Sequence, residues 1–390
     1  MRGSVKKYGT SWCVTFDLGI DPATGKRRQK RKRGFATRKE AETALAKMMK
    51  DAEDGLFDQS SDKITVEDFL EQWLASKEST VRKSTYRSYT WLVKKHVVPH
   101  LGKAKLTDLT PIHLQKFYNM LQKTKREKSE SDRFLSNRTI LHIHIVLQEA
   151  LDRAVKWGLL NRNVAKLVDP PRAKKVQFTV WSQKEAAKFL EVCREDRYYV
   201  VFLLAIMTGM RKGEILGLRW QDVDFEQSVI SVRQSLSYTG KGSEFQAPKI
   251  EHGKRAIAIP AQVVEALKRH KRQQAQEKLL LGQEYQDNDL VVATRFGTFV
   301  TARNLDRSWY KYLDELKIPR IRFHDLRHTH ASLMLLQGVH PKIVSERLGH
   351  ANIGITLDTY SHVMPGLQEA AAAKFADDLF STTTDDKSVM

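Results

Sequence analysis

The sequence predicts a multidomain α+β protein with a small sheet-plus-helix N-terminal domain, an all-helical bundle, and a mainly helical C-terminal domain containing a small antiparallel sheet. The chain has 390 residues, which is too long for one small core. Alternation of apolar and polar residues is confined to short stretches, whereas helical spacing fills the middle of the chain. Linker-like stretches at 55–63 and 169–177 separate the parts. We therefore expect domains at 1–57, 64–168 and 178–390.

The first domain is predicted to be a three-stranded sheet with one helix. Apolar residues alternate with polar ones, as in a half-buried strand, at Trp12, Val14, Phe16 and Leu18. The turn-forming stretch 21–25 follows, and the very basic 26–35 is then a further strand or a basic loop. Thr37 and Glu40 have the spacing of a capping box, which predicts a helix to about Met49.

The second domain is predicted to be helical throughout. Thr65 and Asp68 indicate the start of one helix, and 84–98 a second. Thr110 before Pro111 is a typical cap and first-turn pair for a third. A fourth helix is predicted from apolar residues at helical spacing, namely Ile140, Ile143, Val146, Leu147, Ala150, Leu151 and Ala154.

The third domain is predicted to mix helices with short strands. Ser182 and Glu185 indicate a capped helix. The stretches 222–233 and 253–260 have strand character, and the remainder is mainly helical.

The composition points to a polyanionic partner. The formal net charge is +20, and such a surplus repels itself in a compact protein unless a polyanion is near. Nucleic acid is the favoured partner, and a ribosomal or merely soluble basic protein is the alternative.

Other classes of protein are not expected. No apolar run is long enough to span a membrane, and the first ten residues lack the apolar stretch of a secretory signal. With two cysteines, neither a disulfide framework nor a cysteine-based zinc site is expected, and a reducing cytoplasm is the natural compartment. Nucleotide-binding and metalloprotease motifs are absent, so DNA chemistry here is expected to need no metal and no nucleotide.

Four segments of the third domain carry candidate chemistry. They are 208–220 with Arg211, 247–260 with Lys249, 324–338 with His324 and Arg327, and 348–363 with His350 and Tyr360. Taken singly, each residue has an ordinary interpretation, such as a surface ion pair of Arg211 with Glu214.

Together these residue types suit the cleavage of a phosphodiester. Two Arg can clamp both non-bridging oxygens, and His can hydrogen-bond them or take a proton. Lys can donate a proton to the leaving oxygen if nearby cations lower its pKa. Tyr can attack and hold the phosphate as an ester, which keeps the bond energy for rejoining without ATP.

These segments, in this order, resemble the tyrosine recombinase family, which includes phage integrases and chromosome-dimer resolvases. The motifs that carry the resemblance are TGMRKGEILGLRW, HDLRHTHAS and LGHANIGITLDTYSHV. The resemblance implies a catalytic set of Arg211, Lys249, His324, Arg327, His350 and Tyr360, with Tyr360 as nucleophile and Glu214 as structural support. For the lysine, Lys241 and Lys254 are alternatives close in sequence. Residues 1–57 resemble an arm-type DNA-binding domain and 64–168 a core-binding domain.

The resemblance also implies a function and partners. The expected reaction is integration and excision of a mobile element through a 3′-phosphotyrosyl intermediate; a resolvase-type recombinase or a type IB topoisomerase-like strand transferase is the alternative. Expected partners are double-stranded DNA at core and arm sites, a homotetramer on DNA, an excisionase and a host DNA-bending protein, in the nucleoid of a bacterial cytoplasm. Candidate DNA-binding residues are Arg27, Arg28, Lys30, Arg31, Lys32, Arg82, Lys83 and Arg87.

Overall fold

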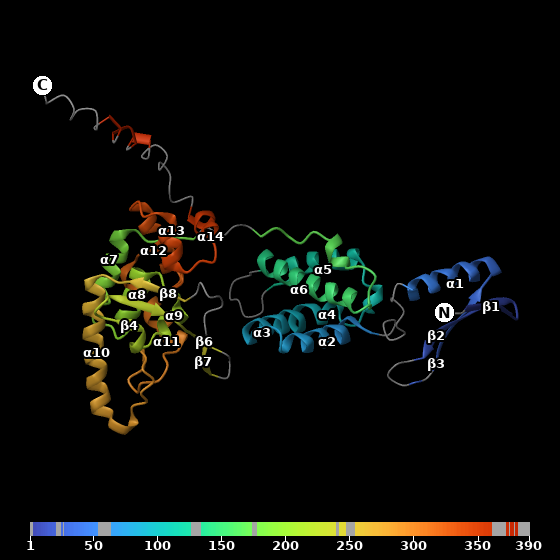
Figure 1. Ribbon diagram of the computed structural model, residues 1–390, viewed down its shortest axis with the longest axis horizontal. Helices are drawn as coiled ribbons and strands as arrows, with labels where there is room; N and C mark the ends of the chain where they lie inside the picture. The colour runs from blue at the N-terminus through green and yellow to red at the C-terminus, as the bar shows by residue number, and fades with distance from the viewer. Residues whose placement is uncertain are drawn as a thin grey trace. The chain divides into compact units, whose positions relative to one another are not determined.

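The computed structural model divides the chain into two compact units, residues 1–175 and 176–390 (Figure 1). It describes residues 3–20, 25, 27–53, 64–125, 134–173, 178–238, 242–246, 254–360, 372–373, 375–377 and 379–380. Within these residues, no helix combines the length and apolar character that crossing a membrane requires. The stretch 55–63, which the sequence indicates as a linker, lies outside the described residues.

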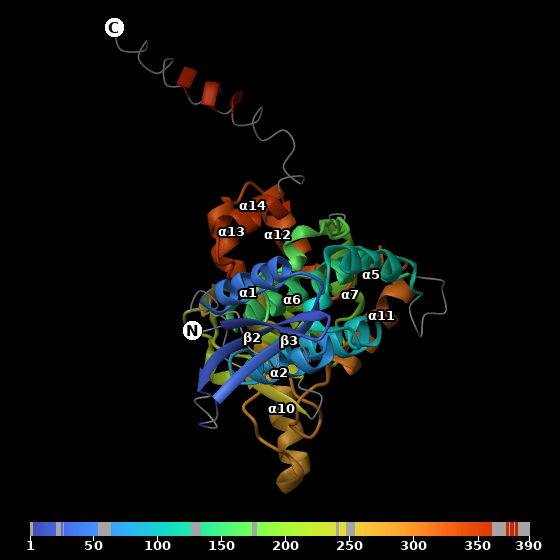
Figure 2. The ribbon, with the colours of Figure 1, turned by 90° about the vertical axis from the view of Figure 1, so that its right-hand side faces the viewer.

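The chain begins with a three-stranded antiparallel sheet in the order β1–β2–β3, and one helix runs along one of its faces (Figures 1 and 2). Its elements are β1 (Gly3–Tyr8), β2 (Ser11–Ile20), β3 (Arg27–Phe35) and α1 (Arg38–Glu53). Val14 and Phe16 alternate along β2 and are fully buried on the helix side, together with Ala41 of α1. The predicted sheet-plus-helix fold is confirmed, and the basic stretch forms its third strand.

The helix α1 begins where the capping box is predicted. The hydroxyl of Thr37 accepts a hydrogen bond from the Glu40 backbone N–H at 3.2 Å, and the Glu40 carboxylate accepts one from Thr37 N–H at 3.4 Å. The helix continues to Glu53, four residues beyond the predicted end at Met49.

The helical region that follows contains five α-helices among the described residues 64–173. They are α2 (Val66–Glu78), α3 (Lys83–Leu92), α4 (Val98–Leu101), α5 (Pro111–Lys123) and α6 (Asn137–Lys156), with short 3-10 turns at Leu106–Asp108 and Val164–Leu167. The predicted helix 84–98 is interrupted by a π-helical turn, Val93–Val97. Its wider turn keeps Val93, His96 and Val97 facing the core.

Local side-chain caps and one apolar core hold this bundle. Thr65 and Asp68 form a reciprocal capping box, and the Thr110 hydroxyl accepts from His113 N–H at 3.3 Å. The predicted apolar face of α6 is buried against large side chains of α2 and α5, including Phe69, Trp73 and Tyr118. The predicted helical region is therefore confirmed.

The second unit is mainly helical with two small antiparallel sheets. Its helices are α7 (Gln183–Val192), α8 (Tyr199–Thr208), α9 (Lys212–Leu216), α10 (Ala261–Leu281), α11 (Ala302–Leu316), α12 (Asp325–Leu336), α13 (Pro341–Leu348) and α14 (Ile353–Tyr360), with 3-10 turns at Trp220–Asp222 and Gly282–Glu284. Its strands are β4 (Val223–Asp224), β5 (Val229–Val232), β6 (Ser235–Tyr238), β7 (Ser243–Gln246) and β8 (Arg255–Ala258).

The strand prediction for 222–233 needs a correction. This stretch is not one strand but a hairpin, in which β4 pairs with β5 across a tight turn and β5 pairs with β8. The Asp224 carboxylate accepts hydrogen bonds from the backbone N–H groups of Glu226 and Gln227, and Ser228 adopts a left-handed φ of 52°. An Asp side chain that bonds its own backbone in this way starts a turn.

The core of the second unit fixes where two helix ends meet. The helix α8 is apolar on all sides, and its Phe202 packs within an aromatic cluster that includes Trp181, Phe189 and Trp309. It ends at Gly209, whose φ is 64° and where an added Cβ would lie 2.6 Å from the Leu348 side chain. Only glycine allows this approach, which brings the end of α8 against the end of α13.

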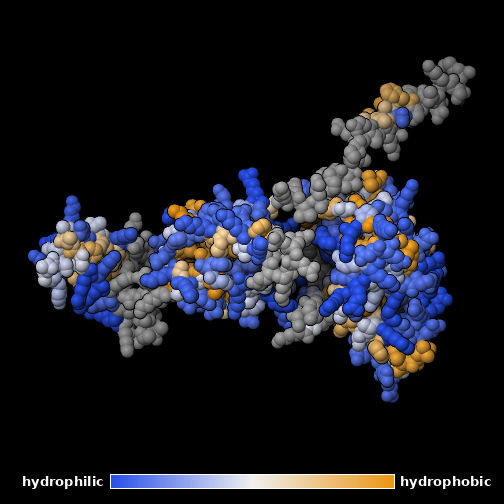
Figure 3. All heavy atoms as spheres, turned by 180° about the vertical axis from the view of Figure 1, so that it is seen from behind, coloured by the Kyte–Doolittle hydropathy of each residue, from blue (hydrophilic) through white to orange (hydrophobic). Residues whose placement is uncertain are grey.

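Polar side chains cover the outside. Figure 3 shows one face of the molecule, on which hydrophilic side chains predominate and hydrophobic ones form small separate patches. This is the distribution expected of domains that bury their apolar residues in their own cores.

Candidate active site

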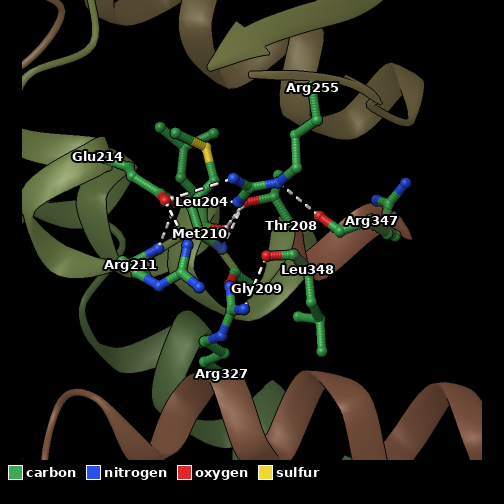
Figure 4. Close-up of polar contacts among 10 residues, drawn as sticks. All are labelled: Leu204, Thr208, Gly209, Met210, Arg211, Glu214, Arg255, Arg327, Arg347 and Leu348. Carbon is green, nitrogen blue, oxygen red and sulfur yellow. Dashed lines mark hydrogen bonds and ion pairs between the residues drawn. The ribbon is translucent and has the colours of Figure 1, made fainter. Parts of the chain in front are cut away.

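A pair of arginines shares one buried carboxylate at the start of α9 (Figure 4). Arg211 donates to Glu214 from its guanidinium at 2.7 Å and from its backbone N–H at 2.9 Å. Arg255, on β8, donates to both Glu214 oxygens at 2.8 and 3.3 Å, and its Nε donates to the Arg347 carbonyl at 2.7 Å. Glu214 thus orients two cations from segments more than forty residues apart in the chain.

Glu214 is ionised in spite of its burial. Burial alone would raise the pKa of its carboxyl group, but the hydrogen bonds and charges of Arg255 and Arg211 lower that pKa to about 2. Since one carboxylate faces two guanidinium groups, this part of the site keeps an excess of positive charge.

We expect Glu214→Gln to destabilise the second unit by about 3 kcal/mol at neutral pH, because buried Arg255 loses its counter-charge. The folded pKa lies below the ordinary value of 4.5, so this contribution is complete above about pH 4.5 and disappears as the pH falls toward 2. Urea denaturation of the wild type and of Glu214→Gln at pH 7 and pH 3.5 measures the difference in their free energies of unfolding. This difference must be smaller at pH 3.5. Glu346→Gln, at an exposed ion pair with Lys342, is the control and should change stability by less than about 0.5 kcal/mol. An equal difference at both pH values would contradict this role of Glu214.

Arg327 is the most enclosed cation of the site. It lies on α12, is 4% exposed, and donates to the carbonyls of Gly209 at 2.8 Å and Leu348 at 2.7 Å. Burial and the charge of Arg211 lower its pKa to about 9. Two like charges are therefore held close together, an arrangement that an anion between them would stabilise.

Two predicted histidines lie beside these arginines. His324 is exposed at the N-cap of α12, and His350 follows α13, with its Nδ1 2.8 Å from the Thr356 hydroxyl. Loss of hydration and the charge of Arg327 lower the pKa of both rings, that of His350 to about 4. Both are therefore neutral at pH 7 and able to donate or accept hydrogen bonds.

Tyr360 ends α14 and points its hydroxyl into the unit. The side chain is 1% exposed and packs against Ala331, Leu335 and Leu348. Burial raises the pKa of its phenol to about 12, although the charge of Arg327 opposes that rise. The hydroxyl lies 2.8 Å from Nδ1 of His328.

The structure brings together most of the residues that the sequence predicts. Arg211, Arg327, His324, His350 and Tyr360 lie at the ends of α8, α13 and α14 and at the start of α12, and each of the other four interacts electrostatically with Arg327. Lys249 and the alternative Lys241 lie outside the described residues. The other alternative, Lys254, is exposed immediately before β8.

Three further residues of the site were not predicted. They are Arg255, His328 and Arg347. The Nε of Arg347 donates to Nε2 of His330 at 3.3 Å. A partial indication was available for His328, because it follows His324 by one helical turn. For Arg255 and Arg347 the sequence offers no local pattern, since their partners come from other segments.

The candidate DNA-binding residues of β3 differ in their surroundings. Arg27 donates to Asp17 and is thereby partly neutralised. Arg31 pairs with Thr15, and Arg33, which is not among the predicted residues, pairs with Cys13. Both therefore lie on the face of the sheet opposite to Phe16 and Val14, which α1 covers. Lys32 pairs with Val14 and lies 5.9 Å from the centre of the Phe35 ring.

The other candidate cations are less fully described. Arg28 and Lys30 lie in β3, with side chains outside the described part of the structure. In the helical bundle, Arg82 at the N-cap of α3 is exposed, as are Lys83 and Arg87 on the first two turns of that helix.

Among the described residues, no group of three or more His, Cys, Asp or Glu side chains lies close enough together to hold a metal ion. The donors of the site are instead guanidinium groups and imidazoles, which bind anions and move protons.

Three stretches match known protein families. Residues 180–366 match the phage integrase family, 65–122 the phage integrase N-terminal SAM-like domain, and 4–52 an arm DNA-binding domain. A tyrosine recombinase XerC-like protein of Caldanaerobacter subterraneus subsp. tengcongensis is 32% identical, over 96% of this chain and 98% of its own. The ICEBs1 integrase of Bacillus subtilis is 28% identical, over 96% of this chain and 99% of its own.

Solved structures share the fold. The Tn1549 transposon integrase in complex with a circular intermediate DNA superposes with a TM-score of 0.67, at 19% identity over 80% of this chain and 99% of that one. A lambda integrase dimer bound to a COC′ core site superposes with a TM-score of 0.57, at 18% identity over 91% of this chain and 94% of that one. The three matched domains and the full-length relative together show that this chain belongs to the phage integrase family of tyrosine recombinases.

Proposed function

We propose that this site-specific recombinase integrates and excises its mobile element by attack of Tyr360 on a scissile phosphate, through a 3′-phosphotyrosyl intermediate. One observation carries the proposal. Buried Arg327 interacts electrostatically with Arg211, His324, His350 and Tyr360, which come from the three segments 208–220, 324–338 and 348–363. A phosphate beside Arg327 would meet cations, neutral imidazoles and a phenol, the groups that phosphoryl transfer to an alcohol needs.

Each group has a proposed role. Arg211 and Arg327 bind the non-bridging oxygens, whose negative charge increases in the transition state. His350 donates a hydrogen bond to the same oxygens, His324 assists proton transfer from Tyr360, and Lys249 protonates the leaving 5′-oxygen. Glu214 acts indirectly, since it orients Arg211 and Arg255.

The ester explains how rejoining can proceed without a cofactor. Because the tyrosyl–phosphate bond is close in energy to the bond that it replaces, a 5′-hydroxyl of a partner strand can attack it and release Tyr360. The chemistry requires a nucleophile, an acid and fixed positive charge, all of which side chains supply.

We further propose that the three parts of the chain contact different DNA. Residues 1–57 bind arm sites, 64–168 bind the core site, and 178–390 cut and rejoin it. Core-site binding is supported by two neighbouring structures, the Tn1549 transposon integrase in complex with a circular intermediate DNA and the lambda integrase dimer bound to a COC′ core site. A homotetramer on paired sites, an excisionase and a host DNA-bending protein, all in a bacterial cytoplasm, complete this proposal.

The experiment that tests the function compares one DNA site with two. Purified protein is incubated with supercoiled plasmids carrying either one or two attachment sites taken from the ends of its own element. Recombination predicts exchanged DNA products only with two sites. Relaxation of the one-site plasmid without exchange on the two-site plasmid would instead favour the topoisomerase-like alternative.

A double variant tests DNA binding by the sheet. We expect Arg31→Ala with Arg33→Ala to weaken arm-site binding and to reduce the slope of log Kd against log salt by about 2, because two phosphate contacts are lost. Fluorescence anisotropy between 50 and 300 mM KCl measures this slope. Lys39→Ala, on the first turn of α1, is the control and should leave the slope unchanged. A double variant with an unchanged slope would place the DNA on another face of the sheet.

A further inference from the structure

The hydroxyl of Tyr360 is not bound to the arginines but to a histidine outside the predicted set. Nδ1 of His328 lies 2.8 Å from the tyrosine Oη, the distance of a good hydrogen bond. The two residues come from α12 and α14 and are 32 positions apart in the chain.

Aromatic neighbours fix the plane of the His328 ring. Phe178 stacks on it with ring centres 4.1 Å apart and an interplanar angle of 6°, and His324 meets it edge-on at 5.7 Å. Phe178 also contacts Tyr360 edge-on at 6.4 Å. Because one stacked ring and one perpendicular ring hold the imidazole, its Nδ1 stays directed at the phenol.

The charges around His328 make it a neutral acceptor. Loss of hydration, together with His324 and the cations Arg327 and Arg322, lowers the pKa of His328 to about 4, and the carboxylate of Asp325 opposes this effect. From the other elements packed nearby, His350 and Tyr360 face it. At neutral pH the ring is therefore uncharged, and in the tautomer that carries its proton on Nε2, Nδ1 can accept the hydrogen bond of the Tyr360 hydroxyl.

We propose that His328 is the proton acceptor for Tyr360 in the cleavage step, an inference that rests on the proposed function. As the bond from Oη to phosphorus forms, the Oη–H bond breaks and its proton passes to Nδ1. The bond from phosphorus to the 5′-oxygen breaks at the same time, and that oxygen takes a proton from a separate acid, the role proposed for Lys249. Rejoining runs the same transfers in reverse.

The position of the acceptor couples proton transfer to substrate binding. In the free site, the positive charge of Arg327 and its neighbours disfavours a second positive charge on His328. A phosphate bound to Arg211 and Arg327 offsets this repulsion, so His328 becomes a stronger base when DNA is in place.

Two substitutions separate proton transfer from hydrogen bonding. His328→Asn places an amide oxygen near the position of Nδ1, which can accept the hydrogen bond but cannot hold the proton. His328→Phe keeps an aromatic ring against Phe178 and removes both functions. Each full-length variant is compared with wild type in single-turnover cleavage of a nicked suicide substrate, after its Kd for the same DNA has been measured.

We expect both variants to bind DNA within about threefold of wild type and to cleave it at least about 100-fold more slowly. A second substrate carries a 5′-bridging sulfur at the scissile position, whose departure needs no acid. It should restore cleavage by Lys249→Met and leave both His328 variants slow.

Three results would overturn the inference. They are cleavage by His328→Phe within threefold of wild type, full activity of His328→Asn, and rescue of either variant by the sulfur substrate. If His328→Phe fails to bind DNA, the asparagine variant decides alone. In each case wild type still forms its adduct, whereas failure of the proposed function itself would leave wild type without an adduct at Tyr360.

Discussion

Tyr360→Phe is expected to abolish covalent attachment to DNA, lowering the cleavage rate by about 10⁴-fold or more, as removal of a nucleophile does. The phenyl ring keeps its buried contacts with Leu335 and Leu348, and the variant loses only the hydrogen bond to His328, worth about 1 kcal/mol. Folding and DNA binding should therefore survive. A nicked suicide substrate, resolved on a denaturing gel, measures the adduct directly.

The matched control is Tyr310→Phe. Tyr310 lies on α11, where Arg320 stacks on its ring at 4.9 Å, outside the site described above. It should form the adduct at the wild-type rate. A persistent adduct in Tyr360→Phe would exclude Tyr360 as the nucleophile, whatever the control shows.

Arg211→Ala is expected to give the second largest loss, about 10²–10³-fold in single-turnover cleavage, because one donor to the phosphoryl oxygens disappears. The Arg211 side chain is 42% exposed, and Glu214 retains Arg255 as its partner, so folding should be little affected. The cleavage rate of Arg211→Lys should lie between those of the wild type and Arg211→Ala, since lysine keeps the charge but lacks the planar pair of donors.

Quenched-flow cleavage with saturating protein measures these rates apart from DNA affinity. The control is Arg320→Ala, which removes an equally cationic side chain from an exposed ion pair with Asp314. A cleavage rate for Arg211→Ala within threefold of wild type would show that Arg211 does not stabilise the transition state. Arg327 is less suitable for this test, because its bonds to the Gly209 and Leu348 carbonyls also hold two helix ends together.

Local sequence patterns predicted much of the fold. The starts of α2, α5 and α7 depend on a side chain and a backbone N–H three residues later, namely at Thr65, Thr110 and Ser182. The apolar spacing of α6 likewise predicted the residues that are buried. The hairpin within 222–233 was missed because both of its strands have the same apolar character, and only the turn at Asp224 divides them.

The candidate site was predictable as a set of residue types but not as a network. Arg211, His324, Arg327, His350 and Tyr360 stand in recognisable segments, whereas Arg255 and His328 gain their roles from partners distant in the chain. The pairing of Arg255 with Glu214 depends on how β8 lies against α9, and that of His328 with Tyr360 on how α12 packs near α14. Such relations follow from tertiary packing, which no local spacing encodes.

The most direct test of the proposed mechanism is to locate the DNA on the protein. The trapped adduct is digested with nuclease and trypsin, and the modified peptide is sequenced by mass spectrometry. The tryptic peptide of residues 348–374 contains a single tyrosine, Tyr360, and it should carry the nucleotide. A nucleotide on any other residue, or an adduct formed without this peptide being modified, would contradict the claim that Arg327 and its neighbours gather around a phosphate for Tyr360 to attack.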